Sequence, residues 1–221
     1  MLTLRSTRRR AATALTFRTV RRVLLLGAVS TAAVLFCSAP VEATIGEQRA
    51  RLPPPAFCED PVEGVWRSHK YNEQFGDWTI FTLEIHRVPG TQNALRGTIS
   101  NELWDGGPSD EQPGPCDGRR HWIVSMDAQG SIQGNRIFFG AVGQWRLDRA
   151  LCVGGPWGYN LDNFSGDIDP EIQEFQSVNN DGGRAVDDPH VFRRVRCFSP
   201  DSLPHVEVAP PPFFPRRAGG C

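Results

Sequence analysis

The chain has 221 residues and a formal net charge of −1. The first 43 residues hold seven basic groups and one acid, so the remainder has 17 basic and 24 acidic groups, a net charge of −7. An acidic domain argues against binding to nucleic acid or to an anionic membrane surface, because phosphates attract basic residues.

The first 43 residues predict a secretory signal peptide. A basic region with seven arginines precedes a 14-residue apolar run, Val23 to Phe36, and a small-residue site follows at Val41-Glu42-Ala43. The apolar run is shorter than the roughly 20 residues that a membrane span needs. This order of segments is typical of a cleaved signal. We therefore predict cleavage after Ala43 and a secreted or periplasmic, bacterial protein, with an uncleaved signal anchor as the alternative.

The segments that follow divide into a linker, a domain and a tail. Residues 44–56 are predicted to be a linker because they include Pro53-Pro54-Pro55. Residues 57–197 are predicted to form one domain, which is long enough to bury a hydrophobic core. Residues 198–221 contain six prolines, which supply no backbone donor, so we predict a disordered Pro-rich tail.

Apolar and polar residues alternate along the domain, which is the pattern of half-buried β-strands. Glycine- and proline-rich turns separate the alternating runs, one of them at Ala128-Gln129-Gly130. We predict about eight strands and a further strand or single helical turn at 172–178; the eight are 63–69, 78–88, 95–104, 120–127, 131–142, 144–149, 159–169 and 190–197. Many short antiparallel strands indicate an all-β fold, a single antiparallel β-barrel with a β-sandwich as the alternative.

Five cysteines remain after signal removal, and in an exported protein they are expected to be oxidised. Cys58 and Cys197 bracket the domain, and Cys116 and Cys152 lie in loop-like segments, so we predict these two pairs, although four cysteines allow three pairings. Cys221 is left over and is either free or available to link two chains in a dimer.

The first two predicted strands suggest a fold family. Gly64-Val65-Trp66 opens the domain, and Leu95-Arg96-Gly97-Thr98-Ile99 follows a long second strand. This arrangement resembles the start of a calycin barrel, the group that includes lipocalins and avidins. The resemblance implies that Trp66 plugs one barrel end under an arginine of the last strand, Arg194 or Arg196. It covers about 40 residues, and the later lipocalin motifs and the biotin contacts of avidin are not present.

No catalytic or cofactor motif is evident in the sequence. The histidines lack metal-binding spacing, and no serine elbow or phosphate-binding loop is present. The densest acidic set is Asp162, Asp167, Asp169 and Glu171. If the protein were an enzyme, its catalytic acid and base would come from this set. Ser177, Asn179, Asp181 and Asp188 have the spacing of a calcium loop, but Asn180-Asp181-Gly182-Gly183 also reads as a hairpin turn. We predict no enzyme activity, no cofactor and no resident metal.

Aromatic residues provide the main indication of a ligand. Trp104, Trp157 and Tyr159 are predicted to lie at loop edges, where they could close a barrel mouth or stack on sugars. The sequence therefore predicts a non-catalytic, lipocalin-like barrel that binds a small apolar or amphipathic ligand. The alternative is a cell-surface carbohydrate-binding or protein-interaction sandwich that uses the same three residues.

Overall fold

The computed structural model describes residues 40–198, with side chains from Ile45 onward. The predicted signal core, the Pro-rich tail after Phe198 and Cys221 lie outside the described residues, whereas the predicted cleavage site after Ala43 falls within the first helix. The described residues form one helix and nine strands: α1 (Pro40–Ala50), β1 (Gly64–Arg67), β2 (Lys70–Asn72), β3 (Asp77–Arg87), β4 (Ala94–Asp105), β5 (His121–Gln133), β6 (Arg136–Ala150), β7 (Asn163–Asp169), β8 (Glu174–Asn179) and β9 (Asp188–Arg196).

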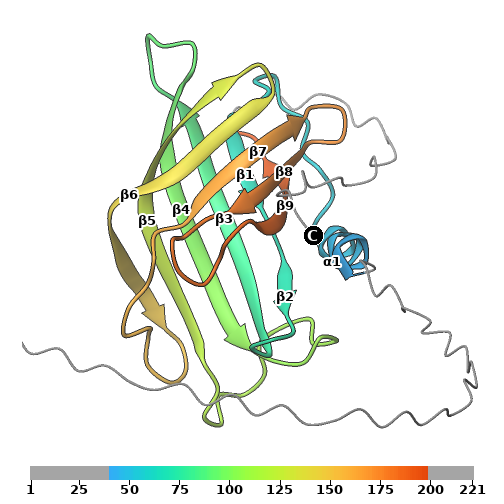
Figure 1. Ribbon diagram of the computed structural model, residues 1–221, viewed down its shortest axis with the longest axis vertical. Helices are drawn as coiled ribbons and strands as arrows, with labels where there is room; N and C mark the ends of the chain where they lie inside the picture. The colour runs from blue at the N-terminus through green and yellow to red at the C-terminus, as the bar shows by residue number, and fades with distance from the viewer. Residues whose placement is uncertain (1–39, 199–221) are drawn as a thin grey trace, which may run out of the picture. The chain divides into compact units, whose positions relative to one another are not determined.

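The strands form a closed antiparallel barrel (Figure 1). The strand order is β1-β9-β8-β7-β6-β5-β4-β3-β2, and β1 also pairs with β3, which closes a ring of eight strands. The short β2 continues β1 after a break at Ser68-His69 and pairs only with the start of β3 among the described strands. The predicted barrel is confirmed, and the sandwich alternative is wrong because the ring has no separate second sheet.

The barrel interior collects the alternate apolar residues of its strands. Phe81, Leu83 and Ile85 of β3 point inward and are almost fully buried. Phe139 of β6 and Phe164 of β7 reach the same core. Because successive strand side chains point to opposite faces, the polar residues between them lie on the outer surface.

One barrel end is closed by Trp66 and Arg194, both fully buried. The Arg194 guanidinium lies 5.0 Å from the Trp66 ring centre, and it donates hydrogen bonds to the Gln173 side chain and to the carbonyls of Asp60 and Glu63. Burial lowers the pKa of Arg194 to about 10, so the side chain remains charged at neutral pH. Arg196, the other arginine that the resemblance indicated, lies on the surface beside Glu84.

Helix α1 occupies part of the segment that was predicted to be a linker, 44–56. Ile45 and Leu52 pack on Val191 of β9. The Gln48 side chain accepts a hydrogen bond from the Val191 amide at 3.0 Å and donates one to the Pro189 carbonyl at 3.2 Å. Pairing between β1 and β9 stops at Arg67, because β2 stays with β3. Gln48 therefore takes the place of a strand partner along the seam between β2 and β9.

The predicted turn at Ala128-Gln129-Gly130 is wrong, since β5 runs through it to Gln133. Gly130 instead permits close strand packing: a Cβ atom there would lie 2.1 Å from the Phe138 carbonyl oxygen. The turn falls at Gly134-Asn135, where Gly134 has a φ of 59°. The first residues of the predicted strand 131–142 therefore belong to the end of β5. The rest of that strand and the predicted strand 144–149 form one bulged strand, β6. The extra element predicted at 172–178 is the strand β8.

Both predicted disulfides are present. Cys58–Cys197 joins the segment before β1 to the end of β9, across 139 residues. Cys116–Cys152 joins the loop between β4 and β5 to the segment that follows β6, across 36 residues. The first disulfide joins the start and the end of the chain segment that forms the barrel. The second joins two loops at the barrel end opposite the Trp66 plug.

Candidate ligand cavity

A cavity of about 860 Å³ lies at the barrel end opposite the Trp66 plug, the lower end in Figure 1. Interior residues of β3, β4, β5, β8 and β9 line its deep wall, and the loops at 72–75, 153–160 and 181–186 surround its mouth. Phe81, Leu103 and Trp122 supply apolar wall. The size falls in the range of small-molecule sites, a few hundred to about 1,000 Å³.

A chain of hydrogen bonds crosses one side of the deep wall. Asn101 Nδ2 donates to the Tyr159 hydroxyl at 2.6 Å, and that hydroxyl donates to Asp162 Oδ2 at 2.6 Å. Asn179 Nδ2 donates to the other Asp162 oxygen at 2.7 Å. Burial raises the pKa of Asp162 to about 7 with help from the charge of Asp181, although both hydrogen bonds oppose this shift. Burial and Asp162 also raise the pKa of Tyr159 well above its ordinary value.

A second polar group lies on the β9 side of the cavity. Asp188 forms an ion pair with Lys70 and accepts a hydrogen bond from His190 Nε2 at 3.0 Å. Burial alone would raise the pKa of Asp188, but His190 and Lys70 together lower it well below its ordinary value. Burial lowers the pKa of His190, with the Lys70 charge adding to this effect and Asp188 opposing it. At neutral pH the site therefore contains an ionised Asp188 and a neutral His190.

Two buried acceptor atoms in this wall have no hydrogen-bond partner among the described residues: Asn101 Oδ1 and His190 Nδ1. The ionised Asp188 can only accept, so the His190 proton lies on Nε2 and Nδ1 carries a lone pair. When Asp162 is ionised, the Tyr159 hydroxyl donates to it and accepts from Asn101 Nδ2, which leaves the Asn101 amide oxygen without a partner. A buried polar atom without a partner is costly, and both atoms lie behind the cavity surface, out of reach of a water-sized molecule.

Charged side chains join the loops around the mouth. Arg120 forms ion pairs with Asp77 and Asp105, and Arg184 forms one with Asp77, whose side chain is fully buried. The Arg184 guanidinium also lies 3.4 Å from the centre of the Phe75 ring. The 181–186 loop is thereby attached to the neighbouring 72–75 turn.

The structure brings together two of the three aromatic residues predicted to bind a ligand. Tyr159 is buried in the cavity wall, and Trp157 is fully exposed on the 153–160 loop beside it. Trp104 does not contribute: it is buried on the outer face of the barrel, stacked on Trp78 at 5.5 Å. A shared surface patch of the three residues is therefore absent from this fold, because strand alternation turns Trp104 away from the interior.

The acidic candidates are divided between different surroundings. Asp162 lies in the cavity, whereas Asp167 and Glu171 are exposed and Asp169 is half-buried on the β7–β8 side. The four residues of the calcium hypothesis belong to the β8–β9 hairpin and are already engaged. Ser177 donates to the His190 carbonyl, Asn179 binds Asp162, Asp181 accepts from loop amides and Asp188 pairs with Lys70.

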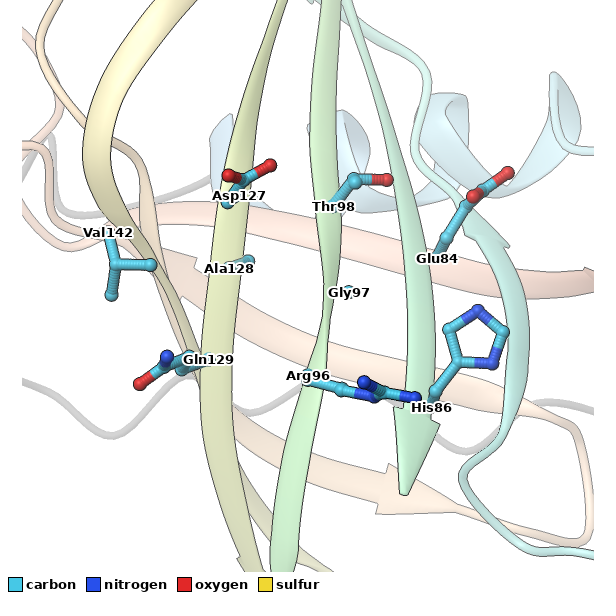
Figure 2. A pocket seen from close by; sticks show the side chains of 9 residues that line it. All are labelled: Glu84, His86, Arg96, Gly97, Thr98, Asp127, Ala128, Gln129 and Val142. Carbon is cyan, nitrogen blue, oxygen red and sulfur yellow. The ribbon is translucent and has the colours of Figure 1, made fainter. Parts of the chain in front are cut away.

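A second depression, of about 360 Å³, lies on the outer face of the barrel (Figure 2). Its side chains come from four neighbouring strands, and Arg96 and His86 are cross-strand neighbours on β4 and β3. Glu84, Arg96 and Asp127 give it mixed charge over a floor at Gly97. No buried polar atom without a partner lies in this depression among the described residues. The interior cavity is therefore the stronger candidate site.

Sequence reasoning did not single out Asn101, Lys70 or His190 as site residues. The signal that could have identified Asn101 is its position in the inward series Ile99, Asn101, Leu103, where a polar residue interrupts an apolar face. His190 falls at the start of the last strand, in phase with the buried Phe192. Both are polar residues at inward positions, which are costly unless they have a partner.

Comparison of the chain with protein-family models, with curated proteins and with solved structures found no match in any of the three. The closed eight-strand barrel is consistent with a calycin-like fold, and this likeness rests on strand topology alone. Within residues 40–198, no helix has both the length and the apolar character needed to cross a membrane.

Proposed function

We propose that this protein is an exported, disulfide-bonded barrel that binds a small amphipathic molecule without transforming it. The observation that carries the proposal is the cavity of about 860 Å³, which combines apolar wall with a few fixed polar groups. Small-molecule sites typically have this composition, because the apolar wall supplies affinity and the polar groups fix orientation. The two disulfides support an oxidising compartment, as expected after export.

The polar groups of the cavity support binding rather than catalysis in this proposal. The two acids of the deep wall are already engaged: Asp162 receives two hydrogen bonds, and Asp188 is paired with Lys70. A site that holds its polar groups in fixed pairs is suited to orienting a ligand. The proposal involves no nucleic acid, no resident metal and no cofactor.

Native mass spectrometry of the gently purified, exported protein tests the proposal. We expect a co-purifying small molecule whose mass is lost on denaturation. Thr79→Trp places a large side chain in the cavity and is expected to abolish co-purification, because Thr79 lines the cavity wall. Thr82→Trp is the matched control, since it lies on the same strand but alternates to the outer face.

Equal ligand content in the two variants would contradict the cavity as the binding site. A protein that never carries a ligand, and binds none from a metabolite extract of its host, would contradict the proposed function itself. N-terminal sequencing of the exported chain tests the compartment separately: the mature chain is expected to begin at Thr44.

A further inference from the structure

Phe198, the last described residue, packs on the outer wall of the barrel. Its ring stacks on His86 of β3, with ring centres 3.9 Å apart and planes 8° from parallel. Two residues earlier, Arg196 forms an ion pair with Glu84 of the same strand at 3.7 Å. His86 and Glu84 both line the outer depression of about 360 Å³. The chain therefore leaves the described domain at the edge of this depression.

The depression is a groove that runs across the strands. Figure 2 shows one row of side chains on each side of a floor at Gly97 and Ala128. The rows are Glu84, Thr98, Asp127 and Val142 on one side and His86, Arg96 and Gln129 on the other. Each row follows the strand order from β3 towards β6. Because neighbouring strands lie about 4.8 Å apart, the groove spans about 14 Å from β3 to β6.

One charge in the groove has no ion-pair partner. The two acids, Glu84 and Asp127, are each paired with an arginine outside the groove. Arg96 is exposed and forms no ion pair within residues 45–198. Its side chain extends toward His86, where the chain enters the groove (Figure 2). The unbalanced charge is therefore positive and favours an occupant with an acid close to this entry.

The sequence that follows the stacked phenylalanine fits the groove in length. It reads Ser199-Pro200-Asp201-Ser202-Leu203-Pro204. Each proline fixes its own backbone dihedral and keeps the preceding residue extended. An extended chain advances about 3.3 Å per residue, so Asp201 lies about 10 Å and Leu203 about 16 Å along the path. These distances suffice to bring Asp201 to Arg96 and Leu203 to Val142.

The chemistry of the same segment also matches the groove. Val142 is 37% exposed at the far end, where it offers an apolar contact. Leu203 is the first large apolar residue after the stacked phenylalanine, and Asp201 precedes it. The acid and the leucine thus come in the order in which the groove presents its arginine and its valine. The two prolines also reduce the conformational entropy that the segment loses on binding.

We propose that residues 199–204 lie in the outer groove of their own domain, with Asp201 bound to Arg96 and Leu203 packed on Val142. The sequence predicted a disordered tail at 198–221, and this inference assigns a place only to the first residues of that tail. It goes beyond the proposed function and does not depend on a ligand in the interior cavity.

Cysteine cross-linking in the full-length exported protein tests the inference. In a Cys221→Ser background, Val142→Cys is combined with Leu203→Cys. Mild oxidation is expected to form a disulfide within one chain, which peptide mapping by mass spectrometry identifies. The matched control combines Phe138→Cys with Leu203→Cys, because Phe138 is also exposed on the outward face of β6 but lies outside the groove. We expect the disulfide to form at least tenfold faster at position 142 than at position 138.

A charge swap tests the polar contact in the same cross-linking assay. Arg96→Glu is expected to slow the reaction at position 142 about fivefold, because it turns the attraction of an exposed ion pair into repulsion. Adding Asp201→Arg should restore the rate. Arg149→Glu, at an exposed arginine of β6 outside the groove, is the control and should leave the rate unchanged. A swap that fails to restore the rate would overturn the inference.

Nuclear magnetic resonance of the protein without substitutions gives an independent test, which holds even if a cysteine variant fails to fold. We expect a nuclear Overhauser effect between the methyl groups of Leu203 and Val142. Its absence, or equal cross-linking at positions 142 and 138, would overturn the inference. A disulfide between two chains, in place of one within a chain, would assign the groove to the tail of a second copy and would also overturn it.

Discussion

Asp162 and Asp188 line the same cavity but have opposite pKa shifts, because their partners differ. Asp188 is beside Lys70 and His190, which favour its ionised form and lower its pKa. Asp162 has only neutral donors, from Tyr159 and Asn179, and burial raises its pKa to about 7. The comparison shows that a hydrogen bond from a neutral group compensates only part of the cost of burying a charge.

The raised pKa of Asp162 predicts a specific pH dependence of stability. The folded protein binds a proton here that the unfolded chain releases above the ordinary pKa of 3.8. The stabilisation is therefore complete below about pH 4 and is lost as pH rises through about 7. At about 1.4 kcal/mol per pKa unit, the free energy of unfolding falls by roughly 4 kcal/mol over this range. Asp162→Asn replaces the ionisable carboxyl group with a neutral amide and should remove this pH dependence.

Urea unfolding at pH 4.5 and pH 8 measures the effect as the difference between wild type and Asp162→Asn. Taking this difference cancels the opposite contributions of Asp188 and His190, whose lowered pKa values weaken the fold as pH falls. Asp167→Asn, on the exposed side of β7, is the control. Parallel stability curves for wild type and Asp162→Asn would contradict the buried, protonated state.

Helix α1 acts at the scale of elements, since it completes the barrel wall where β2 leaves β9. Its contribution depends on Gln48, which is buried and satisfies two backbone groups of β9. Gln48→Leu is expected to destabilise the fold by about 1–3 kcal/mol, because the Val191 amide and the Pro189 carbonyl lose their partner. Glu47→Ala, on the exposed side of the same helix, should cost little.

Urea unfolding measures the two stabilities, and hydrogen exchange at the Val191 amide reports the seam directly. We expect faster exchange of this amide in Gln48→Leu and unchanged exchange in Glu47→Ala. A variant in which Val191 remains protected would show that the helix is not the partner of β9.

The sequence was sufficient for features set by local pattern. Alternation such as Phe81, Leu83, Ile85 predicted the strands. The positions of Cys58 and Cys197 predicted the disulfide that joins the segment before the first strand to the end of the last strand. Features set by distant contacts were missed. Gly130 looks like a turn residue until Phe138 is placed beside it, and Trp104 looks like a ligand contact until strand register turns it outward. Gln48 gives no local sign of its partners on β9, over 140 residues away.

At the scale of the whole domain, the two disulfides are expected to have separate effects. Cys58–Cys197 closes a long loop, and its loss should cost about 5 kcal/mol in the chain-entropy model. Cys116–Cys152 closes a shorter loop, for which the model gives about 4 kcal/mol, and it anchors the segment leading into the 153–160 cavity loop.

Paired serine variants separate the two effects. Cys58→Ser with Cys197→Ser should lower the free energy of unfolding more, as measured in urea. Cys116→Ser with Cys152→Ser should accelerate hydrogen exchange in the 153–160 loop more. The reverse order in either measurement would contradict the assignment of the first bridge to the barrel and the second to the cavity mouth.

The seam at α1 also determines when the protein can finish folding. Gln48, near the start of the described chain, binds β9 at its end, and β9 is the strand that joins β1 to β8. The ring therefore cannot close until the residues of β9, up to Arg196, are available to the rest of the domain. Until then one edge of β1 lacks its partner strand and Cys58 lacks its partner cysteine, so barrel closure and the long-range disulfide are both late events of folding.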